Sequence, residues 1–434
     1  MTPELQIIVV FGAFLALLVL GMSVPFAICV PALLYLLLLG GPDALKGLGL
    51  VSWGSMNSFA LSSIPLFILM AELMERSGLS HRTYRGLARI VCVVPGGLLQ
   101  TNIAGCAIFS AISGSSVATA AAIGGVALPQ LEKRGYSRPL SAGSLAAGGT
   151  LGILIPPSIA MIVYATFTEV SIAKLFMAGV VPGIVLTLLF MAYIAVHALI
   201  QPGIAPREQG PQSGREWLQA VGELTPAVLL IVGTMGSMYL GFATATEAAA
   251  VGCAFVLVAA RLWGRMDGAI LGDALKATAL TSGNIMFIVF AAFLFSYAIS
   301  LGGVGEKLTT LLVHMKLSKY EFMFALLIFF TILGALVESL GMIVITVPLL
   351  YPLLANYGID PVWFGIIVVV FIEMGQITPP IGINLFVIQS ISRGKLSDEV
   401  MGTVPFHLLM FVLLIMLVAW PGLALWLPAQ VSGR

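Results

Sequence analysis

The chain has 434 residues, of which 59% are apolar and only 9% are charged, and its formal net charge is +1. Soluble domains carry roughly 25% charged residues, so this composition excludes a soluble globular protein and indicates a polytopic protein of the lipid bilayer. A net charge near zero gives no reason to expect a nucleic-acid partner. The four cysteines lie in apolar stretches without paired spacing, which indicates buried thiols rather than a disulfide or a metal site.

Apolar stretches in the first half predict spanning helices with one unusual interruption pattern. The stretch 5–22 is long enough to span and has no basic residues before it, which argues against a cleaved signal peptide. Two apolar arms around a Gly/Ser tip at 113–116 predict a re-entrant hairpin, with two full spans as the alternative. In chain order we expect spans at 5–22, 24–40 and 51–74, a basic loop at 76–89, a hairpin at 90–131, an interrupted span at 140–168, a short segment at 169–178 and a span at 179–200.

A polar stretch divides the chain into two halves of similar pattern. Residues 201–216 are rich in Pro, Gly and Gln, and they predict a linker over 201–223. No P-loop is present, so ATP is not expected to be the direct energy source. In the second half we expect spans at 224–242, 246–262 and 278–300, a hairpin at 320–355, an interrupted span at 362–391 and a last span at 404–426.

The pattern of Gly and Pro repeats along the chain. Adding 223 to a residue number turns Ser116 into Ser339, Gly152 into Gly375, and the pair Pro156-Pro157 into Pro379-Pro380. Gly and Pro constrain backbone geometry, so this match indicates a duplicated unit rather than chance. We therefore expect two repeats, 1–200 and 224–434, whose scaffold spans are 5–50 and 224–262.

Loop charges suggest how the repeats lie in the membrane. Most Lys and Arg residues fall in loops on the side of the 76–89 segment, which places that side and the linker in the cytoplasm. Each half then has about five spans plus one hairpin. Because five is odd, the copies would insert upside down relative to each other, as the inverted repeats of secondary transporters do. The expected fold class is thus an all-α polytopic inverted repeat.

The first hairpin tip carries hydroxyls beside a helix start. Ser113, Ser115, Ser116 and Thr119 supply the oxygens, and Gly114 lets the backbone turn. A half-helix N-terminus there would favour an anion, while carbonyls freed at the break could face a sodium ion. Close helix packing through small residues is the alternative explanation.

The paired prolines interrupt the two long spans. They remove backbone donors, so the carbonyls of Gly152 to Ile155 and of Gly375 to Thr378 are expected to be free acceptors. Ser158, Thr378 and Asn384 add side-chain oxygens nearby. These breaks predict an ion or substrate site, with a packed kink as the alternative.

Acidic residues within spans are costly and usually functional. Glu338 lies at the second tip and is a candidate site residue. Glu247 and Glu373 are weaker candidates, and a helix cap is the alternative role for Glu247. An intramembrane enzyme would need a nucleophile with a base or a set of metal ligands. The intramembrane serines have no His or Asp partner at a recognisable spacing, so we do not expect an enzyme.

Long motifs resemble the large membrane subunit of TRAP (tripartite ATP-independent periplasmic) transporters. The resemblance covers about residues 24–405. It rests on several motifs, including G-S-S-V-A-T-A-A-A-I-G at 114–124, L-G-I-L-I-P-P-S-I at 151–159 and I-T-P-P-I-G-I-N-L-F-V at 377–387. One departure is Glu338, since the family usually carries Asp at this tip, and the longer side chain alters the geometry expected there.

The resemblance implies an elevator-type secondary transporter of the bacterial or archaeal inner membrane, driven by Na⁺ with no other cofactor. It also implies a small four-helix membrane subunit, here expected not to be fused at the N-terminus, a periplasmic substrate-binding protein, and a small organic anion as solute. Sodium would lie where tips meet interrupted helices, at Ser113, Gly114, Ser115, Ser116, Gly152 and Pro156, and at Glu338, Ser339, Gly341, Gly375, Thr378 and Pro379. The anion would lie between the tips, with Ser116, Thr119, Ser158 and Asn384 as candidate ligands.

The expected mechanism moves both hairpins and both interrupted spans past the scaffold. Joint binding of sodium and solute would order the tips and prevent a sodium leak. A stand-alone sodium–carboxylate symporter, which needs no binding protein, is the main rival hypothesis, and an intramembrane enzyme is a remote one.

Overall fold

A computed structural model describes residues 3–206, 208, 210–304, 307, 310 and 315–431, and all regular elements in these residues are helices. The first half begins with α1 (Pro3–Val19) and α2 (Val24–Gly40). It continues through the short turns and helices η1 (Gly41–Gly47), α3 (Leu48–Met56), η2 (Phe59–Ser62), α4 (Ser63–Arg76) and α5 (Leu79–Val91). The first hairpin and the interrupted span follow as α6 (Leu98–Ser113), α7 (Ser116–Lys133), α8 (Arg138–Leu154), α9 (Ile159–Thr168) and α10 (Ile172–Ile200).

The second half follows the short helix η3 (Pro202–Ile204) and also contains a hairpin and an interrupted span. Its first helices are α11 (Gly214–Tyr239), α12 (Ala245–Trp263) and α13 (Gly268–Leu301). The second hairpin and interrupted span are α15 (Lys319–Gly334), α16 (Ser339–Leu354), η4 (Ala355–Tyr357), α17 (Pro361–Gln376) and α18 (Ile383–Ser392). The chain ends with α19 (Leu396–Ala419) and α20 (Gly422–Val431). The start of α7 at Ser116 and of α16 at Ser339 keeps the spacing of the repeat.

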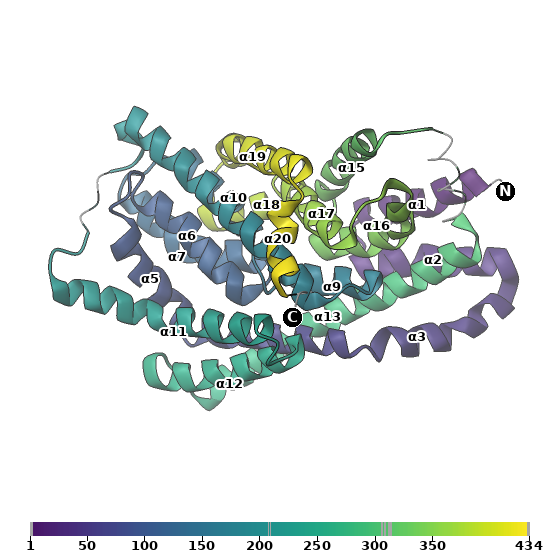
Figure 1. Ribbon diagram of the computed structural model, residues 1–434, viewed down its shortest axis with the longest axis horizontal. Coiled ribbons are helices and arrows are strands. Elements are labelled where there is room, and N and C mark those ends of the chain that lie inside the picture. The colour runs from purple at the N-terminus through teal and green to yellow at the C-terminus, as the bar shows by residue number, and fades with distance from the viewer. Residues whose placement is uncertain are drawn as a thin grey trace.

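The helices form two broad groups in space. In Figure 1, α3, α11 and α12 lie along the lower edge, and the hairpins and interrupted helices lie above them. Each hairpin packs on the interrupted helix of its own half, α6 and α7 on α8, and α15 and α16 on α17. The two halves also contact each other, because α9 packs on α16 and α18 packs on α7. The two breaks are therefore brought into one body.

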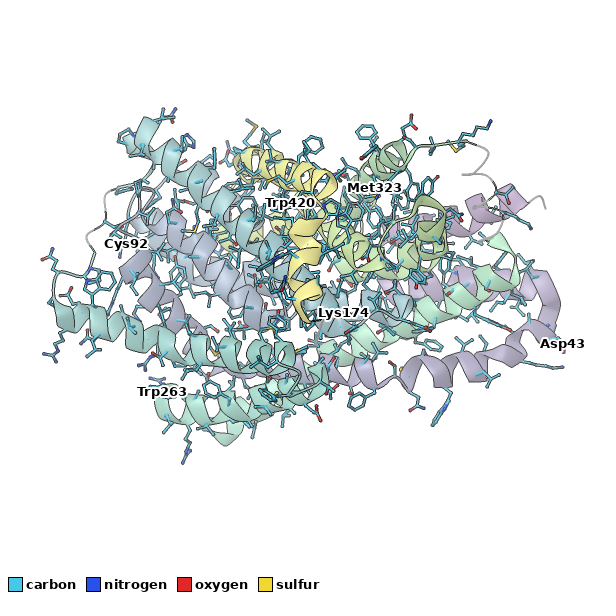
Figure 2. The ribbon with its side chains drawn as sticks, viewed as in Figure 1. Asp43, Cys92, Lys174, Trp263, Met323 and Trp420 are labelled. Carbon is cyan, nitrogen blue, oxygen red and sulfur yellow. The ribbon has the colours of Figure 1, made fainter. Side chains whose placement is uncertain are left out.

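The membrane-spanning character of the chain is confirmed within the described residues. Eight helices there are long and apolar enough to cross a membrane. Large apolar side chains cover the outside, among them Trp263 and Trp420, which are labelled in Figure 2. In water such a surface would be unfavourable, whereas acyl chains solvate it.

The basic loop expected at 76–89 is largely a helix. In α5 the apolar residues Leu79 and Leu87 are buried on one face, while Arg85 and Arg89 lie on the other and approach Glu223 of α11 at 3.7 and 3.9 Å. The density of charge predicts a loop, but the amphipathic period of the stretch favours a helix with one buried face.

Several predicted bounds also change. The span expected at 51–74 is broken between α3 and α4, where the hydroxyls of Ser62 and Ser63 donate to nearby backbone carbonyls and compete with the helix. A single helix, α10, covers most of the segments expected at 169–178 and 179–200. The last long helix, α19, ends before Pro421, because proline has no N–H to continue the helical hydrogen bonds. The linker ends earlier than residue 223, because Ser213 caps α11 by accepting from the N–H of Glu216 at 3.3 Å.

Candidate functional site

A cavity of about 330 Å³ lies between the tips of the two hairpins. The first tip contributes Ser113, Gly114 and Ser115, and the second contributes Glu338 and Ser339. In each hairpin the first helix ends and the second helix begins after two to four residues. These short breaks form the two tips that face the cavity. Five of the predicted site residues thus share one chamber.

The scaffold side of the cavity comes from residues that the sequence analysis did not assign to the site. Helix α4 contributes Glu72 and Glu75, and helix α13 contributes Thr281 and Asn284. The sequence did contain signals for these residues. They are two carboxylates three residues apart at the end of one apolar helix and an Asn within another. The sequence could not show that these two helices face the tips.

The described lining of this cavity is acidic and contains no Lys, Arg or His. Glu72 is paired with Arg76 at 2.7 Å, whereas the side-chain carboxylates of Glu75 and Glu338 have no ion pair or hydrogen bond among the described residues. A small anion in this cavity would meet net negative charge. Besides the hydroxyls and the Asn284 amide, the donors available in the described lining are backbone N–H groups.

Two helix N-termini supply those groups. Helix α7 starts at the first tip, where the Ser115 hydroxyl accepts from the Ala118 N–H at 3.4 Å. Helix α16 starts at the second tip, with Glu338 at its N-cap position and no capping bond from its side chain. The unpaired N–H groups of a first turn carry partial positive charge. These N–H groups can donate to a carboxylate, but the acidic side chains of the same lining oppose its binding.

The first tip also gathers oxygen atoms against α8. The hydroxyls of Ser113 and Thr119 are 2.8 Å apart, and the Ser113 hydroxyl lies 3.3 Å from the Ser115 carbonyl oxygen. Gly152 makes this approach possible, because a methyl group there would lie 2.5 Å from that carbonyl oxygen and 2.8 Å from Thr119 Oγ1. Hydroxyl and carbonyl oxygens at a helix break are the ligands that coupling ions use in transporters.

The predicted substrate ligands lie behind the tip rather than on the cavity surface. Asn384 is fully buried, and its Nδ2 donates to Ser116 Oγ at 2.7 Å and to the Ala146 carbonyl at 3.1 Å. Ser158 caps α9 by accepting from the Met161 N–H at 3.4 Å. Thr119, Ser116, Ser158 and Asn384 are all absent from the described lining of the cavity. In this conformation Asn384 holds the start of α7 through Ser116, and Ser158 holds the start of α9.

The first break is tied directly to its tip. The Ile159 N–H, which follows Pro156, Pro157 and Ser158, donates to the Gly114 carbonyl at 3.2 Å. Pro156 itself is buried.

The second break meets a different part of its hairpin from the one expected. Gly334 and Gly375 are in contact, such that a methyl group on Gly375 would lie 2.7 Å from the Gly334 Cα. The Ile381 N–H donates to the Ala335 carbonyl at 3.2 Å. Gly341 lies farther along α16, where a methyl group would be 3.0 Å from Val24 of α2.

Near the second break, the carbonyl of Gly375 is not free. It accepts from the Thr378 N–H at 3.0 Å, because the helix ends in a tight turn before the prolines. The Thr378 hydroxyl donates to the Met374 carbonyl at 2.7 Å and lies 2.8 Å from His407 Nε2, and Pro379 is exposed. Glu247, in contrast, forms the helix cap suggested for it, since it accepts from the Thr244 N–H at 2.8 Å.

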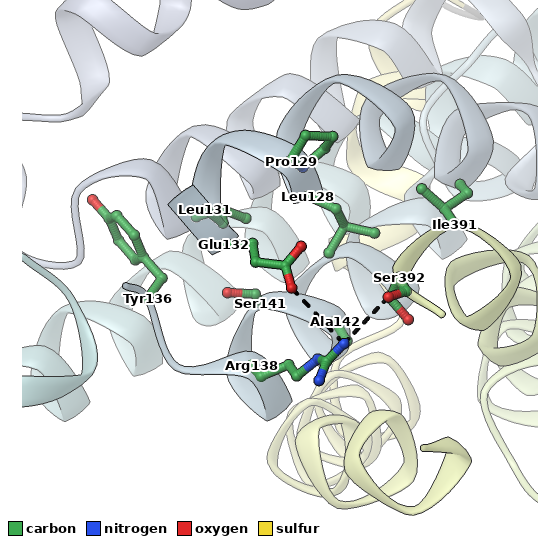
Figure 3. A pocket seen from close by; sticks show the side chains of 10 residues that line it. All are labelled: Leu128, Pro129, Leu131, Glu132, Tyr136, Arg138, Ser141, Ala142, Ile391 and Ser392. Atoms are coloured by element: carbon green, nitrogen blue, oxygen red, sulfur yellow. Dashed lines mark hydrogen bonds and ion pairs between the residues drawn. The ribbon is translucent and has the colours of Figure 1, made fainter. Parts of the chain in front are cut away.

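A smaller pocket of about 160 Å³ lies at the base of the first hairpin (Figure 3). Arg138 donates to the Ser392 carbonyl at 3.3 Å and approaches Glu132 at 3.9 Å, so it joins the start of α8 to the end of α18. None of the predicted site residues lines this pocket, and we assign it a structural role.

The eight long apolar helices among the described residues define the class of a multi-pass membrane protein. Comparison with known proteins agrees. The family described as "Tripartite ATP-independent periplasmic transporter, DctM component" matches residues 11–423. The chain belongs to this family of large permease components, and it is a multi-pass protein of the inner membrane. Its relatives are named as permeases, so it is not an enzyme.

Named relatives cover almost all of the chain. The C4-dicarboxylate TRAP transporter large permease protein DctM of Pseudomonas aeruginosa is 35% identical over 90% of this chain and 91% of that protein. The protein of the same name from Vibrio cholerae is 34% identical, with coverage of 97% and 98%. The ectoine/5-hydroxyectoine TRAP transporter large permease protein UehC of Ruegeria pomeroyi is 30% identical, with coverage of 96% and 97%.

A solved structure supports the fold. The crystal structure of the Alcanivorax borkumensis YdaH transporter, described as having an unusual topology, aligns with a TM-score of 0.65 and 17% identity. The alignment covers 88% of this chain and 90% of that one. At this identity the likeness concerns the fold alone.

Proposed function

We propose that this chain couples the inward movement of Na⁺ to the uptake of a small organic acid, with the cavity between the tips as the transport site. The observation that supports this is the composition of the cavity, which joins both tips but has acidic side chains and no basic one in its described lining. An organic anion would bind there poorly on its own. A sodium ion at the oxygen cluster of the first tip would supply the missing positive charge, which couples the two ligands thermodynamically.

The movement we propose is that of an elevator. Residues 1–200 and 224–434 would be inverted repeats, and the hairpins with α8, α9, α17 and α18 would form the mobile body. The cross-packing of α9 on α16 and of α18 on α7 supports a single body. The helices α1, α2, α11 and α12 would be the scaffold.

The partners follow from the family. The family name describes a transporter of three components, of which this chain is one. We propose that the other two are a small four-helix membrane subunit and a periplasmic binding protein that delivers the solute. Relatives are named for C4-dicarboxylates and for ectoines, so we propose a small carboxylate as the solute class.

The experiment that tests this function is uptake into proteoliposomes containing this chain and its small subunit. Labelled organic acids are supplied with the binding protein, with or without an inward Na⁺ gradient. We expect uptake only when both the gradient and the binding protein are present. Equal uptake without the gradient contradicts sodium coupling, and equal uptake without the binding protein favours a stand-alone symporter.

The first tip offers a sharper test of the sodium site. In Thr119→Val the hydroxyl beside Ser113 is replaced by a methyl group, and one lost ligand worth about 1.4 kcal/mol would raise the Na⁺ concentration for half-maximal uptake about tenfold. Thr119→Ser keeps the hydroxyl and is expected to stay within about twofold of the original chain. An unchanged sodium dependence in Thr119→Val would remove this residue from the site.

A further inference from the structure

Glu373 is the fully buried carboxylate of α17, close to the second break. Its exposed fraction is 0%, and neither carboxylate oxygen has a hydrogen-bond partner among the described residues. The charged form of such a group is very unfavourable unless a cation compensates it. In a membrane protein an intramembrane carboxylate of this kind indicates function.

Gln376 provides a second and independent observation. It is also 0% exposed, and both its amide oxygen and its amide nitrogen lack partners. Three residues along an α-helix correspond to a rotation of about 300°, so the two side chains leave α17 only about 60° apart. The Gly375 contact with α15 lies on another face, about 160° from Glu373 by the same geometry.

Asn384 lies on the first turn of α18, just after the break. It is fully buried, and while its Nδ2 is bonded to Ser116 and Ala146, its Oδ1 has no partner in the described structure. Three buried side chains with unpaired oxygens thus flank Pro379 and Pro380. Native structures leave few such atoms, and each needs an explanation.

We propose that Glu373 and Gln376 bind a sodium ion of their own, separate from the ion at the Ser113–Thr119 cluster. The carboxylate would neutralise the ion, and the amide oxygen would be a second ligand from nearly the same helix face. This inference rests on the proposed sodium-coupled function.

The test is equilibrium binding of ²²Na⁺ to the full chain purified with its small subunit in lipid nanodiscs. The variants are Glu373→Gln, which removes the charge at constant size, and Gln376→Leu, which removes the amide. The matched control is Glu321→Gln, which changes an exposed carboxylate at the start of α15 that caps this helix. We expect Glu373→Gln to bind one sodium ion fewer per chain than the original protein and the control. Gln376→Leu should bind the same ion at least about tenfold more weakly, as expected for a lost ligand.

The outcomes separate the two proposals. If the original chain binds no sodium, the sodium-coupled function itself fails. If it binds sodium and Glu373→Gln binds the same number, this inference is wrong, and Glu373 is a protonated structural residue. Should Glu373→Gln fail to fold, Gln376→Leu decides alone, and unaltered sodium affinity in that variant overturns the site.

Discussion

Gly152 shows how one missing side chain can support a site. It faces the Ser115 carbonyl and the Thr119 hydroxyl from α8, at distances that leave no room for a methyl group. The corresponding position in the second half, Gly375, faces Gly334 in a similarly close contact. At both positions glycine allows a helix backbone to approach the hairpin of its own half.

We expect Gly152→Ala to lower sodium-dependent uptake about tenfold or more, because the tip must move away from α8 and its oxygen cluster opens. The measurement is initial uptake rate at fixed sodium concentration, normalised to the amount of protein in the membrane. Gly125→Ala on α7 is the matched control, since nothing lies within 4 Å of a methyl group there. Equal rates in the two variants would contradict the proposed role of Gly152.

At the scale of elements, two helices from different halves cross in close backbone contact. Gly143 of α8 and Gly402 of α19 face each other, and a methyl group on Gly402 would overlap the Pro139 carbonyl. Small residues that allow backbones to meet are a common basis of helix association in membranes. This crossing joins the first interrupted span to the last long helix.

We expect Gly402→Ala to lower the melting temperature of the purified chain, since overpacking of this kind typically costs about 1–3 kcal/mol. Thermal unfolding in detergent measures it. Gly236→Ala on α11 adds the same methyl group where nothing lies within 4 Å, and it is expected to be neutral or slightly stabilising. If both variants melt alike, the crossing is not a point of tight packing.

For the whole molecule, the central prediction is the inversion of the two repeats. Lys133 and Asn356 are equivalent under the offset of 223, and both lie at the exposed base of a hairpin. The four native cysteines are buried, so a membrane-impermeant thiol reagent should give little background. Opposite insertion of the repeats would place the two positions on opposite faces of the membrane.

We expect Lys133→Cys to be labelled only from the cytoplasmic side and Asn356→Cys only from the periplasmic side. Labelling of intact spheroplasts and of inverted vesicles distinguishes the two faces. The original chain, treated in the same way, controls for the native cysteines. Labelling of both positions from one side would exclude an inverted repeat.

Much of the fold could be predicted because Gly and Pro act through local backbone geometry. The hairpins at 90–131 and 320–355 and the interruptions of the long spans all recur in the helix bounds. Helix α5 and the break before α4 were missed, since an amphipathic period and hydroxyls bonded to the backbone are weaker signals than apolar length.

The site was only partly predictable. The sequence by itself determined that the chain is an all-helical membrane protein with two broken units, because composition and backbone-breaking residues act locally. Only the tertiary structure decided that Glu75 and Asn284 face the tips, that Asn384 holds Ser116, and that Gly334 meets Gly375. Those contacts depend on how distant helices pack, and helical spacing within one segment does not specify its neighbours.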